Sequence, residues 1–496
     1  MHIPASDDCN PPPSLPGPSL TTIVSETLGV TISPMRERGV PETPDQLQAS
    51  FNEIFDAYTE ACQDHASEPP DTFADSLHDF EVKLIKVVLR FRFFKAVNPD
   101  IYLDVVKLPA IRSMLDLLNG RYHCGNLLAG FILCTFERLT DPDIFVPGQE
   151  EEATLFVKSL VELGALNVFV STLDKFPVDA VHFPAVQTIA QMIFLVPELA
   201  VPAGLNSQLM DWVFKALSSP IWNDLKMHVL GLLNTLLMSS MENRREFGKM
   251  DAVIVVVNAL SSLEEDFVPH EEYLLQTLFC CLLFLLECPD NIVRFAEAGG
   301  VQSMIGIIQQ EDFGYCHGSA IVALDKAVEA YQSAYEEFVN DDLAFDTAFH
   351  PFRDMNPPSI YHEMEEIEEH QISLIASLIG GIAKTENSLL KKFEENDFER
   401  ITWLMELYSE KVEAVTNHLK GKQSIDVILG YLWSSEYSTI QSRIKSQLTH
   451  QDLEMKHVED SLSAYRDNIG NAGESVESPK TAMEECIDSL EVMKCY

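Results

Sequence analysis

The hydrophobic and polar positions between residues 225 and 310 form two copies of one pattern. In each copy a long apolar segment ends at a short polar break. A polar stretch with a single phenylalanine follows, and then a second apolar segment begins. Phe247 matches Phe295 and Val253 matches Val301, each 48 residues later. A fixed offset of this size is typical of stacked helical repeats, in which each unit buries its apolar faces against its neighbours.

The order of segments within each copy predicts the fold. The pattern indicates a long helix, a short helix, a bend of small residues and another apolar helix, which is the helix order of an armadillo repeat. The second helices of five repeats are expected to start near residues 111, 166, 209, 253 and 301. We therefore predict an all-α protein, an armadillo-type right-handed superhelix of stacked helical repeats with a helical C-terminal cap. The alternative is an ordinary helical bundle in which the two copies resemble each other by chance.

Changes in composition divide the chain into five predicted parts. Residues 1–44 hold nine of the 26 prolines and are expected to form a disordered, Pro-rich arm. Residues 45–97 predict an N-terminal helical cap, and residues 98–350 hold the armadillo-like repeats. Residues 360–471 predict a C-terminal helical region, and residues 472–496 an acidic, flexible tail.

The charge of the chain narrows the class of partner. The formal net charge is −43, from 34 basic and 77 acidic residues. Such a field repels nucleic acid and anionic membranes and attracts basic partners, so we expect neither direct nucleic-acid binding nor membrane association. The most apolar stretch, residues 274–286, is too short to span a bilayer. The ten cysteines include no CxxC pair, which fits a reducing compartment, and the first residues predict no secretory signal.

A catalytic function is not indicated. The sequence has no Walker loop, no GxGxxG after a predicted strand, no GxSxG elbow and no HExxH motif. His362 and His370 lie eight residues apart beside glutamates, but a solvated helix face is the favoured interpretation over a metal site. We predict that the protein is not an enzyme and has no catalytic residues, no metal site and no cofactor.

Several segments together resemble one family. Residues 391–415, KKFEENDFERITWLMELYSEKVEAV, resemble a signature block of the beta-catenin-like protein 1 family, which are nuclear armadillo proteins. Residues 98–118, residues 241–261 and the terminal AYRDNIGN of residues 464–471 resemble the same family in the same order. The resemblance is colinear from about residue 47 to 471.

The resemblance implies a function. Members of the family associate with the spliceosome and bind basic nuclear-localisation-type segments of splicing factors, including a Myb-related core component. We therefore expect a nuclear protein-binding scaffold in pre-mRNA splicing, with self-association possible. The alternative is a cytoplasmic catenin-like scaffold for signalling or cytoskeletal partners, because a fold does not fix a function. The family's basic import segment has only a poor counterpart here, residues 35–38, so the route into the nucleus is left open.

Third helices line the concave groove of an armadillo stack, so they supply the candidate peptide-binding residues. Importin-type members carry Trp and Asn one turn apart there. The same register here gives Gly231 and Thr235, then Phe279 and Leu283, so that ladder is absent. Trp212 is either a groove anchor or, by the favoured interpretation, a core residue.

Polar side chains on or near the third helices could bind a basic segment instead. Carboxylates could pair with its Lys and Arg side chains, and amides could hydrogen-bond its main chain. Plain solvation is the alternative for each. The candidate carboxylates are Glu137, Asp141, Glu287, Asp325 and Glu329, and the candidate amides are Gln187, Gln191, Asn234 and Gln276. Asp325 and Glu329 are expected to be exposed.

Overall fold

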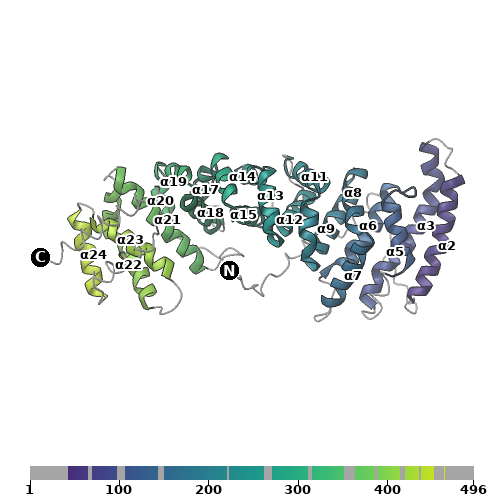
Figure 1. Ribbon diagram of the computed structural model, residues 1–496, viewed down its shortest axis with the longest axis horizontal. Helices are drawn as coiled ribbons and strands as arrows, with labels where there is room; N and C mark the ends of the chain where they lie inside the picture. The colour runs from purple at the N-terminus through teal and green to yellow at the C-terminus, as the bar shows by residue number, and fades with distance from the viewer. Residues whose placement is uncertain are drawn as a thin grey trace. The chain divides into compact units, whose positions relative to one another are not determined.

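The fold is known from a computed structural model of the chain. The structure describes residues 43–64, 70–97, 107–142, 150–219, 223–261, 271–310, 316–350, 364–385, 389–413, 419–434, 437–451 and 463. Within these ranges every regular element is a helix (Figure 1), so the predicted all-α class is confirmed. Apart from residues 43 and 44, which lie at the start of the first described helix, the predicted arm falls outside these ranges, as does the tail.

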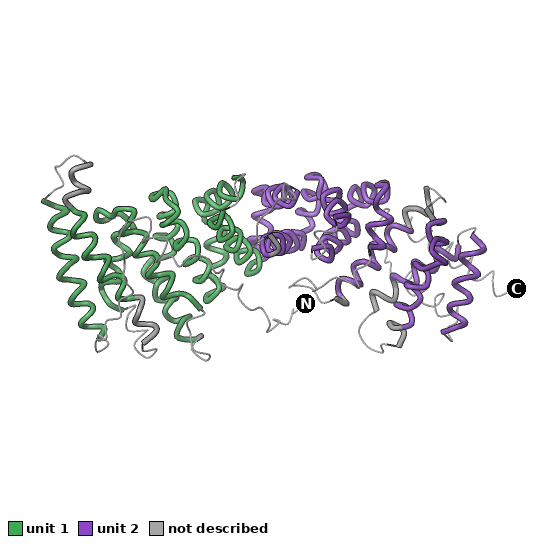
Figure 2. Tube along the Cα trace, turned by 180° about the vertical axis from the view of Figure 1, so that it is seen from behind, with its two compact units in different colours: residues 1–240 green, residues 241–496 purple. Residues whose placement is uncertain are grey.

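The chain divides into two compact units (Figure 2). Unit 1 comprises residues 1–240 and unit 2 comprises residues 241–496. The predicted boundaries at residues 97, 350 and 360 remain predictions.

Unit 1 begins with two packed helices, α2 (Pro44–Asp64) and α3 (Pro70–Val97). Thr43 caps α2 with a reciprocal pair of hydrogen bonds. Its hydroxyl accepts from the Gln46 amide at 3.3 Å, and the Gln46 side chain accepts from the Thr43 amide at 2.9 Å. This capping box satisfies backbone donors that the first turn leaves open. The buried residues of α2 then recur at helical spacing on one face: Leu47, Phe51, Phe55 and Tyr58.

The rest of unit 1 stacks in layers. Successive third helices pack on one another, α3 on α6, α6 on α9 and α9 on α12, and the second helices α5, α8 and α11 pack in the same order. The elements are α5 (Pro109–Leu118), α6 (Asn126–Thr140), α7 (Glu150–Glu162), α8 (Ala165–Lys175), α9 (Asp179–Leu195), η2 (Pro197–Leu199), α10 (Ala200–Gly204), α11 (Ser207–Leu217) and α12 (Asp224–Ser239).

Unit 2 continues the repeats and then changes to longer helices. Its repeat elements are α13 (Met241–Lys249), α14 (Ala252–Ser261), α15 (Glu271–Leu285), α16 (Pro289–Glu297), α17 (Gly300–Ile308), α18 (His317–Ala330), α19 (Gln332–Val339) and α20 (Ala344–Ala348). Its C-terminal elements are α21 (Met364–Thr385), η4 (Leu389–Glu394), α22 (Glu395–Glu413), α23 (Leu419–Ser434) and α24 (Ser438–His450).

The predicted starts of the second helices are confirmed. The five helices begin within two residues of the predicted positions, at Pro109, Ala165, Ser207, Ala252 and Gly300. The hydrophobic period therefore identified the repeat correctly.

The repeat anchors are buried. Phe247 and Phe295 are both 0% exposed, and so is Asn291. The Asn291 amide nitrogen donates to the Arg244 carbonyl and to the Leu285 carbonyl, each at 2.9 Å. One side chain therefore joins α13 of one repeat, the end of α15 and α16 of the next repeat.

Two glycines make room for these anchors. A Cβ added at Gly248 would overlap the Asn291 side chain, and one added at Gly300 would overlap the Phe295 ring. The small residues in the repeat pattern are therefore required by close packing as well as by the bend.

The segment that carries the family resemblance packs the C-terminal helices onto the last repeat. Phe393 of η4 lies edge-on to Phe345 of α20 and to Phe349, which follows α20, with ring centroids 5.5 and 5.3 Å away. Trp403 of α22 contacts Phe349 at 6.3 Å. Aromatic pairs of this geometry stabilise a core beyond the area they bury.

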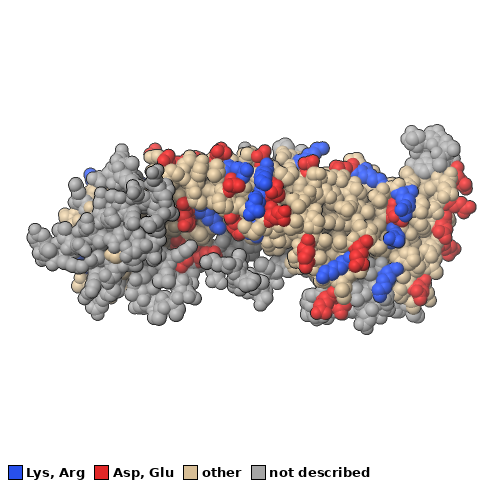
Figure 3. All heavy atoms as spheres, in the orientation of Figure 1, with Lys and Arg blue, Asp and Glu red and all other residues tan. Residues whose placement is uncertain are grey.

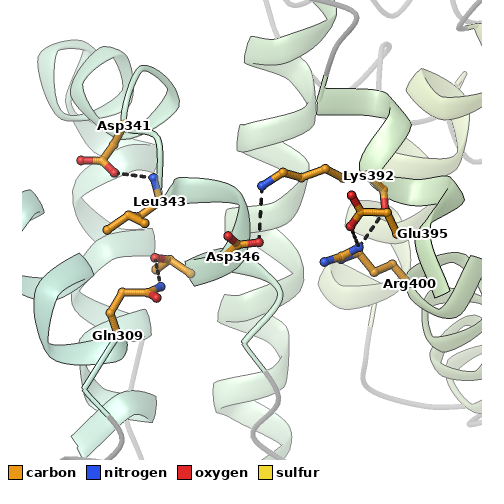
Figure 4. Close-up of polar contacts among 8 residues, drawn as sticks. Gln309, Asp341, Leu343, Asp346, Lys392, Glu395 and Arg400 are labelled. Atoms are coloured by element: carbon orange, nitrogen blue, oxygen red, sulfur yellow. Dashed lines mark hydrogen bonds and ion pairs between the residues drawn. The ribbon is translucent and has the colours of Figure 1, made fainter.

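Charged side chains lie over the rings of this aromatic cluster, and Figure 4 shows the polar contacts that these charged residues make. Lys392 Nζ lies 3.5 Å from Asp346 Oδ1 and 4.9 Å from the centre of the Phe345 ring. The Arg400 guanidinium donates to the Lys392 carbonyl at 2.7 Å and to Glu395 at 3.1 Å. Lys392 and Arg400 are thus held by this chain's own acids and rings.

Among the described residues, no single helix has both the length and the apolar composition to cross a membrane. Two consecutive helices, Glu151–Glu162 and Ala165–Lys175, have the required length and apolar composition only when they are taken together, and a bend of 69° separates them.

Candidate functional site

The candidate residues of unit 1 lie on α6, α9 and α12. Glu137 and Gln187 are half-buried on their helices. Asp141 caps the end of α6, where it accepts from the Arg138 guanidinium at 2.9 Å. Gln191 is only 6% exposed and accepts from the Thr140 hydroxyl at 2.7 Å, so it joins α6 to α9. The remaining unit 1 candidate, the α12 amide Asn234, is half-buried.

The candidate residues of unit 2 differ in how exposed they are and in whether they are already paired with another residue of the chain. Gln276 is half-buried on α15. Glu287 forms an ion pair with Arg244, whose guanidinium also lies 4.7 Å from the Phe284 ring centre. Glu329 is exposed at the end of α18.

The expected exposure of Asp325 is wrong. Asp325 is 3% exposed, and its Oδ2 lies 2.7 Å from Nδ1 of His370. The reason is that α21 packs along α18 and covers this position. His370 is therefore a partner of Asp325. His362 lies outside the described residues, among which no group of three His, Cys, Asp or Glu residues could hold a metal ion.

The expected groove register also fails on α15. Gly231 and Thr235 are half-buried on α12, but Phe279 and Leu283 are 1% and 7% exposed and belong to the core. Positions 48 residues apart on α12 and α15 therefore differ in exposure, although they match in the sequence pattern.

Trp212 is not on a third helix. It lies on α11, where its ring meets the His182 ring of α9 at 5.2 Å. This favours the packing interpretation for Trp212.

Sequence reasoning missed the acids on α19 and just after it because it considered only third helices. Glu336 and Asp342 are exposed, and Glu337 and Asp341 are half-buried, all close in sequence to Glu329. Glu336 accepts from Gln332 at 3.0 Å, and Asp341 accepts from the Leu343 amide at 2.8 Å (Figure 4). Helices α18, α19 and α21 pack together. We call Glu329, Glu336, Glu337, Asp341 and Asp342 the acidic surface of unit 2.

Figure 3 shows how charge is distributed on one face of the molecule. Acidic and basic side chains are interspersed over the described surface of that face, and the basic ones gather in no single patch there.

A buried polar cluster in unit 1 is structural. The Tyr58 hydroxyl donates to the His123 carbonyl at 2.9 Å, and Glu81 accepts from the Gly125 amide at 3.1 Å. Burial, followed by the nearby Glu81 carboxylate, raises the pKa of the Cys124 thiol to about 12. Because the thiolate is the reactive form, this cysteine is a poor nucleophile at neutral pH.

Comparison with known proteins identifies relatives over most of the chain. A family model described as catenin-beta-like, Arm-motif containing nuclear matches residues 50–423. Beta-catenin-like protein 1 of Rattus norvegicus is 26% identical over 446 residues, which cover 80% of this chain and 77% of that protein. The Mus musculus and Homo sapiens proteins of the same name are 25% identical over the same shares.

Solved structures share the fold. An engineered protein aligns with 96% of this chain and 99% of its own, with a TM-score of 0.51 and 11% identity. A structure from a study of the phosphorylation switch between cadherin and beta-catenin aligns with 90% of this chain and 79% of its own, with a TM-score of 0.51 and 12% identity. At these identities the likeness concerns the architecture alone. Since the family model covers most of the sequence and the helices stack as armadillo repeats, this chain belongs to the catenin-beta-like family of Arm-motif-containing nuclear proteins.

Proposed function

We propose that this protein is a nuclear, spliceosome-associated scaffold that docks basic nuclear-localisation-type segments of splicing factors. The observation that carries the proposal is the family match over residues 50–423, since the family is described as nuclear. The resemblance of residues 391–415 to the family's signature block adds the link to splicing factors. The protein acts by binding and not by catalysis, as an armadillo scaffold does.

The charge of the chain supports a basic ligand. A net charge of −43 accelerates the encounter with a Lys/Arg-rich segment and discourages acidic competitors. The acidic surface of unit 2 is the best docking place among the described residues. Glu329 and Glu336 are exposed there, whereas Glu287 and Asp325 are already held by Arg244 and His370.

Reversing Glu329 and Glu336 together to lysine should weaken a Lys/Arg-rich peptide by about 2- to 30-fold. Each exposed pair contributes roughly 0.2–1 kcal/mol, and two pairs are lost. Affinity should also fall as added salt shortens the screening length from about 10 Å at 0.1 M toward about 3 Å at 1 M. Fluorescence anisotropy with a labelled basic peptide measures both effects.

The matched control is the double reversal of Glu53 and Glu60 to lysine. These acids are exposed on α2, they are also seven residues apart, and they change the net charge equally. If both double variants lose the same affinity, the effect is a general one of net charge, and the ligand does not bind at the acidic surface of unit 2.

A further inference from the structure

The second half of α3 has a charge opposite to that of the whole chain. Residues 82–97 contain five of the 34 Lys and Arg residues and no Asp or Glu, whereas the net charge of the chain is −43. Helix α3 packs on α2 and on α6 at the start of unit 1 (Figure 1). The basic residues of α3 therefore form a local exception within a strongly acidic protein.

Ion pairing inside the chain does not account for these bases. Lys83 and Lys86 are exposed and Arg90 is half-buried, and spacings of three and four residues place them on one face of α3. Neither lysine forms an ion pair with any residue that the structure describes, although Asp79 is exposed one turn before Lys83. Lys83 Nζ lies 5.4 Å from the centre of the Phe80 ring, which attracts an ammonium but does not neutralise its charge.

Apolar side chains accompany the bases on the same face. Val82 and Leu89 are half-buried, and they lie four residues before and three residues after Lys86. They are therefore its neighbours on the helix surface. Val82 and Leu89 are two turns apart, about 10 Å along the helix at 1.5 Å per residue. We call Val82, Lys83, Lys86, Leu89 and Arg90 the basic face of α3.

The combination of charged and apolar groups identifies a class of ligand. A second helix lying along α3 presents side chains at the same seven-residue period, so its apolar residues can pack on Val82 and Leu89. The positions that flank those apolar residues then face Lys83, Lys86 and Arg90. Carboxylates form charge-assisted hydrogen bonds with such cations. An acidic amphipathic helix has both features.

Two other occupants fit the basic face of α3 less well. Nucleic acid would present phosphates but no apolar side chains to Val82 and Leu89, and the net charge of −43 repels it. A second copy of this chain would offer the acidic helix α2. The exposed positions of α2 include Glu53 and Glu60, but they hold no apolar residue larger than alanine.

We propose that the basic face of α3 binds an acidic amphipathic helix of a partner protein. Apolar side chains of that helix pack on Val82 and Leu89, and its carboxylates pair with Lys83, Lys86 and Arg90. The proposal goes beyond the docking of basic segments, because the ligand has the opposite charge and the site lies in unit 1.

Fluorescence anisotropy of a labelled, hydrocarbon-stapled helical peptide with the purified full chain tests the proposal. The peptide has leucine at every seventh position, glutamate at the positions that flank each leucine on the helix surface, and alanine elsewhere. The double variant Lys83→Glu/Lys86→Glu should bind it at least about fivefold more weakly than the natural chain, because repulsion replaces two ion pairs. Lys83→Gln/Lys86→Gln should fall between the two. Both lysines are exposed, so circular dichroism should show unchanged thermal stability in both variants.

Two altered peptides separate the contributions of charge and apolar contact. One has glutamine in place of every glutamate, and the other has alanine in place of every leucine. Each should bind the natural chain more weakly than the parent peptide does, because each retains only half of the proposed contacts.

The matched control variant is Arg245→Glu/Lys249→Glu. Arg245 and Lys249 are also exposed, lie one turn apart on α13 of unit 2, and change the net charge equally when they are reversed. This variant should keep the affinity of the natural chain for the acidic peptide to within about twofold.

Equal losses in the two double reversals would show a general effect of net charge and would overturn the proposal. So would a glutamine peptide or an alanine peptide that binds as tightly as the parent. If a labelled single-stranded RNA binds more tightly than the peptide and needs Lys83 and Lys86, nucleic acid is the occupant. If the peptide dissociates a dimer of the chain, a second copy is the occupant. Either result overturns the assignment to a partner protein.

The test is independent of the basic-segment function. Reversal of Glu329 and Glu336 should not weaken the acidic peptide, and reversal of Lys83 and Lys86 should not weaken a Lys/Arg-rich peptide. Failure of one proposal is therefore distinguishable from failure of the other.

Discussion

Replacing Asp325 by lysine should reduce the free energy of unfolding by about 3–5 kcal/mol, the usual effect of breaking a buried charged contact. Asp325 is 3% exposed and lies 2.7 Å from His370 Nδ1. A lysine would place an ammonium beside that ring in a site that α18 and α21 close. An ammonium buried without a partner is strongly unfavourable. Urea unfolding followed by circular dichroism measures the loss.

The control for this prediction is the same substitution one turn away. Glu329 is exposed on the same helix, so Glu329→Lys should change the free energy of unfolding by no more than about 0.5 kcal/mol. Asp325→Asn, which keeps a polar group opposite His370, should fall between the two. Equal stability of the two lysine variants would mean that α21 does not cover Asp325.

Replacing Asn291 by aspartate should reduce the free energy of unfolding by at least about 3 kcal/mol. The Asn291 amide donates to the carbonyls of Arg244 and Leu285, and it is 0% exposed. Aspartate has the same shape but no donor, so a carboxylate would face two carbonyl oxygens that each lose one hydrogen bond. The Leu285 carbonyl still accepts from the Cys288 amide at 3.1 Å, so the main cost is a buried charge that faces carbonyl oxygens without a donor between them. The contact from Arg294, at 3.2 Å, persists but supplies no donor to either carbonyl.

Asn258→Asp is the matched control, because Asn258 is exposed on α14. Chemical unfolding of both variants separates the general effect of one more negative charge from the loss of the two hydrogen bonds. A similar small change in both would show that Asn291 does not join the repeats as described.

The helical repeat could be predicted from the sequence because its signal is local and periodic. Apolar positions recur within each helix, and the phenylalanine anchors recur 48 residues apart, so the helix starts were correct to within two residues. The exposure of single polar residues could not be predicted in this way. Asp325 is covered by a helix whose partner residue, His370, lies 45 positions later. Gln191 is held by Thr140, which lies 51 positions earlier.

The segment with the strongest family resemblance turned out to have a structural role. Phe393 and Trp403 lie in the aromatic cluster that joins α20 to the C-terminal helices, and Lys392 and Arg400 cover it. The resemblance of residues 391–415 is therefore evidence for a shared architecture more directly than for a shared binding site.

Affinity purification of the tagged full chain from whole-cell extract, with the bound proteins identified by mass spectrometry, tests the central claim most directly. The natural chain and the Glu53/Glu60 double reversal should both retain splicing-complex proteins that carry basic segments, and the Glu329/Glu336 double reversal should retain less of them. Recovery of cytoskeletal or signalling proteins from the cytoplasm, with no splicing proteins from any variant, would contradict the account.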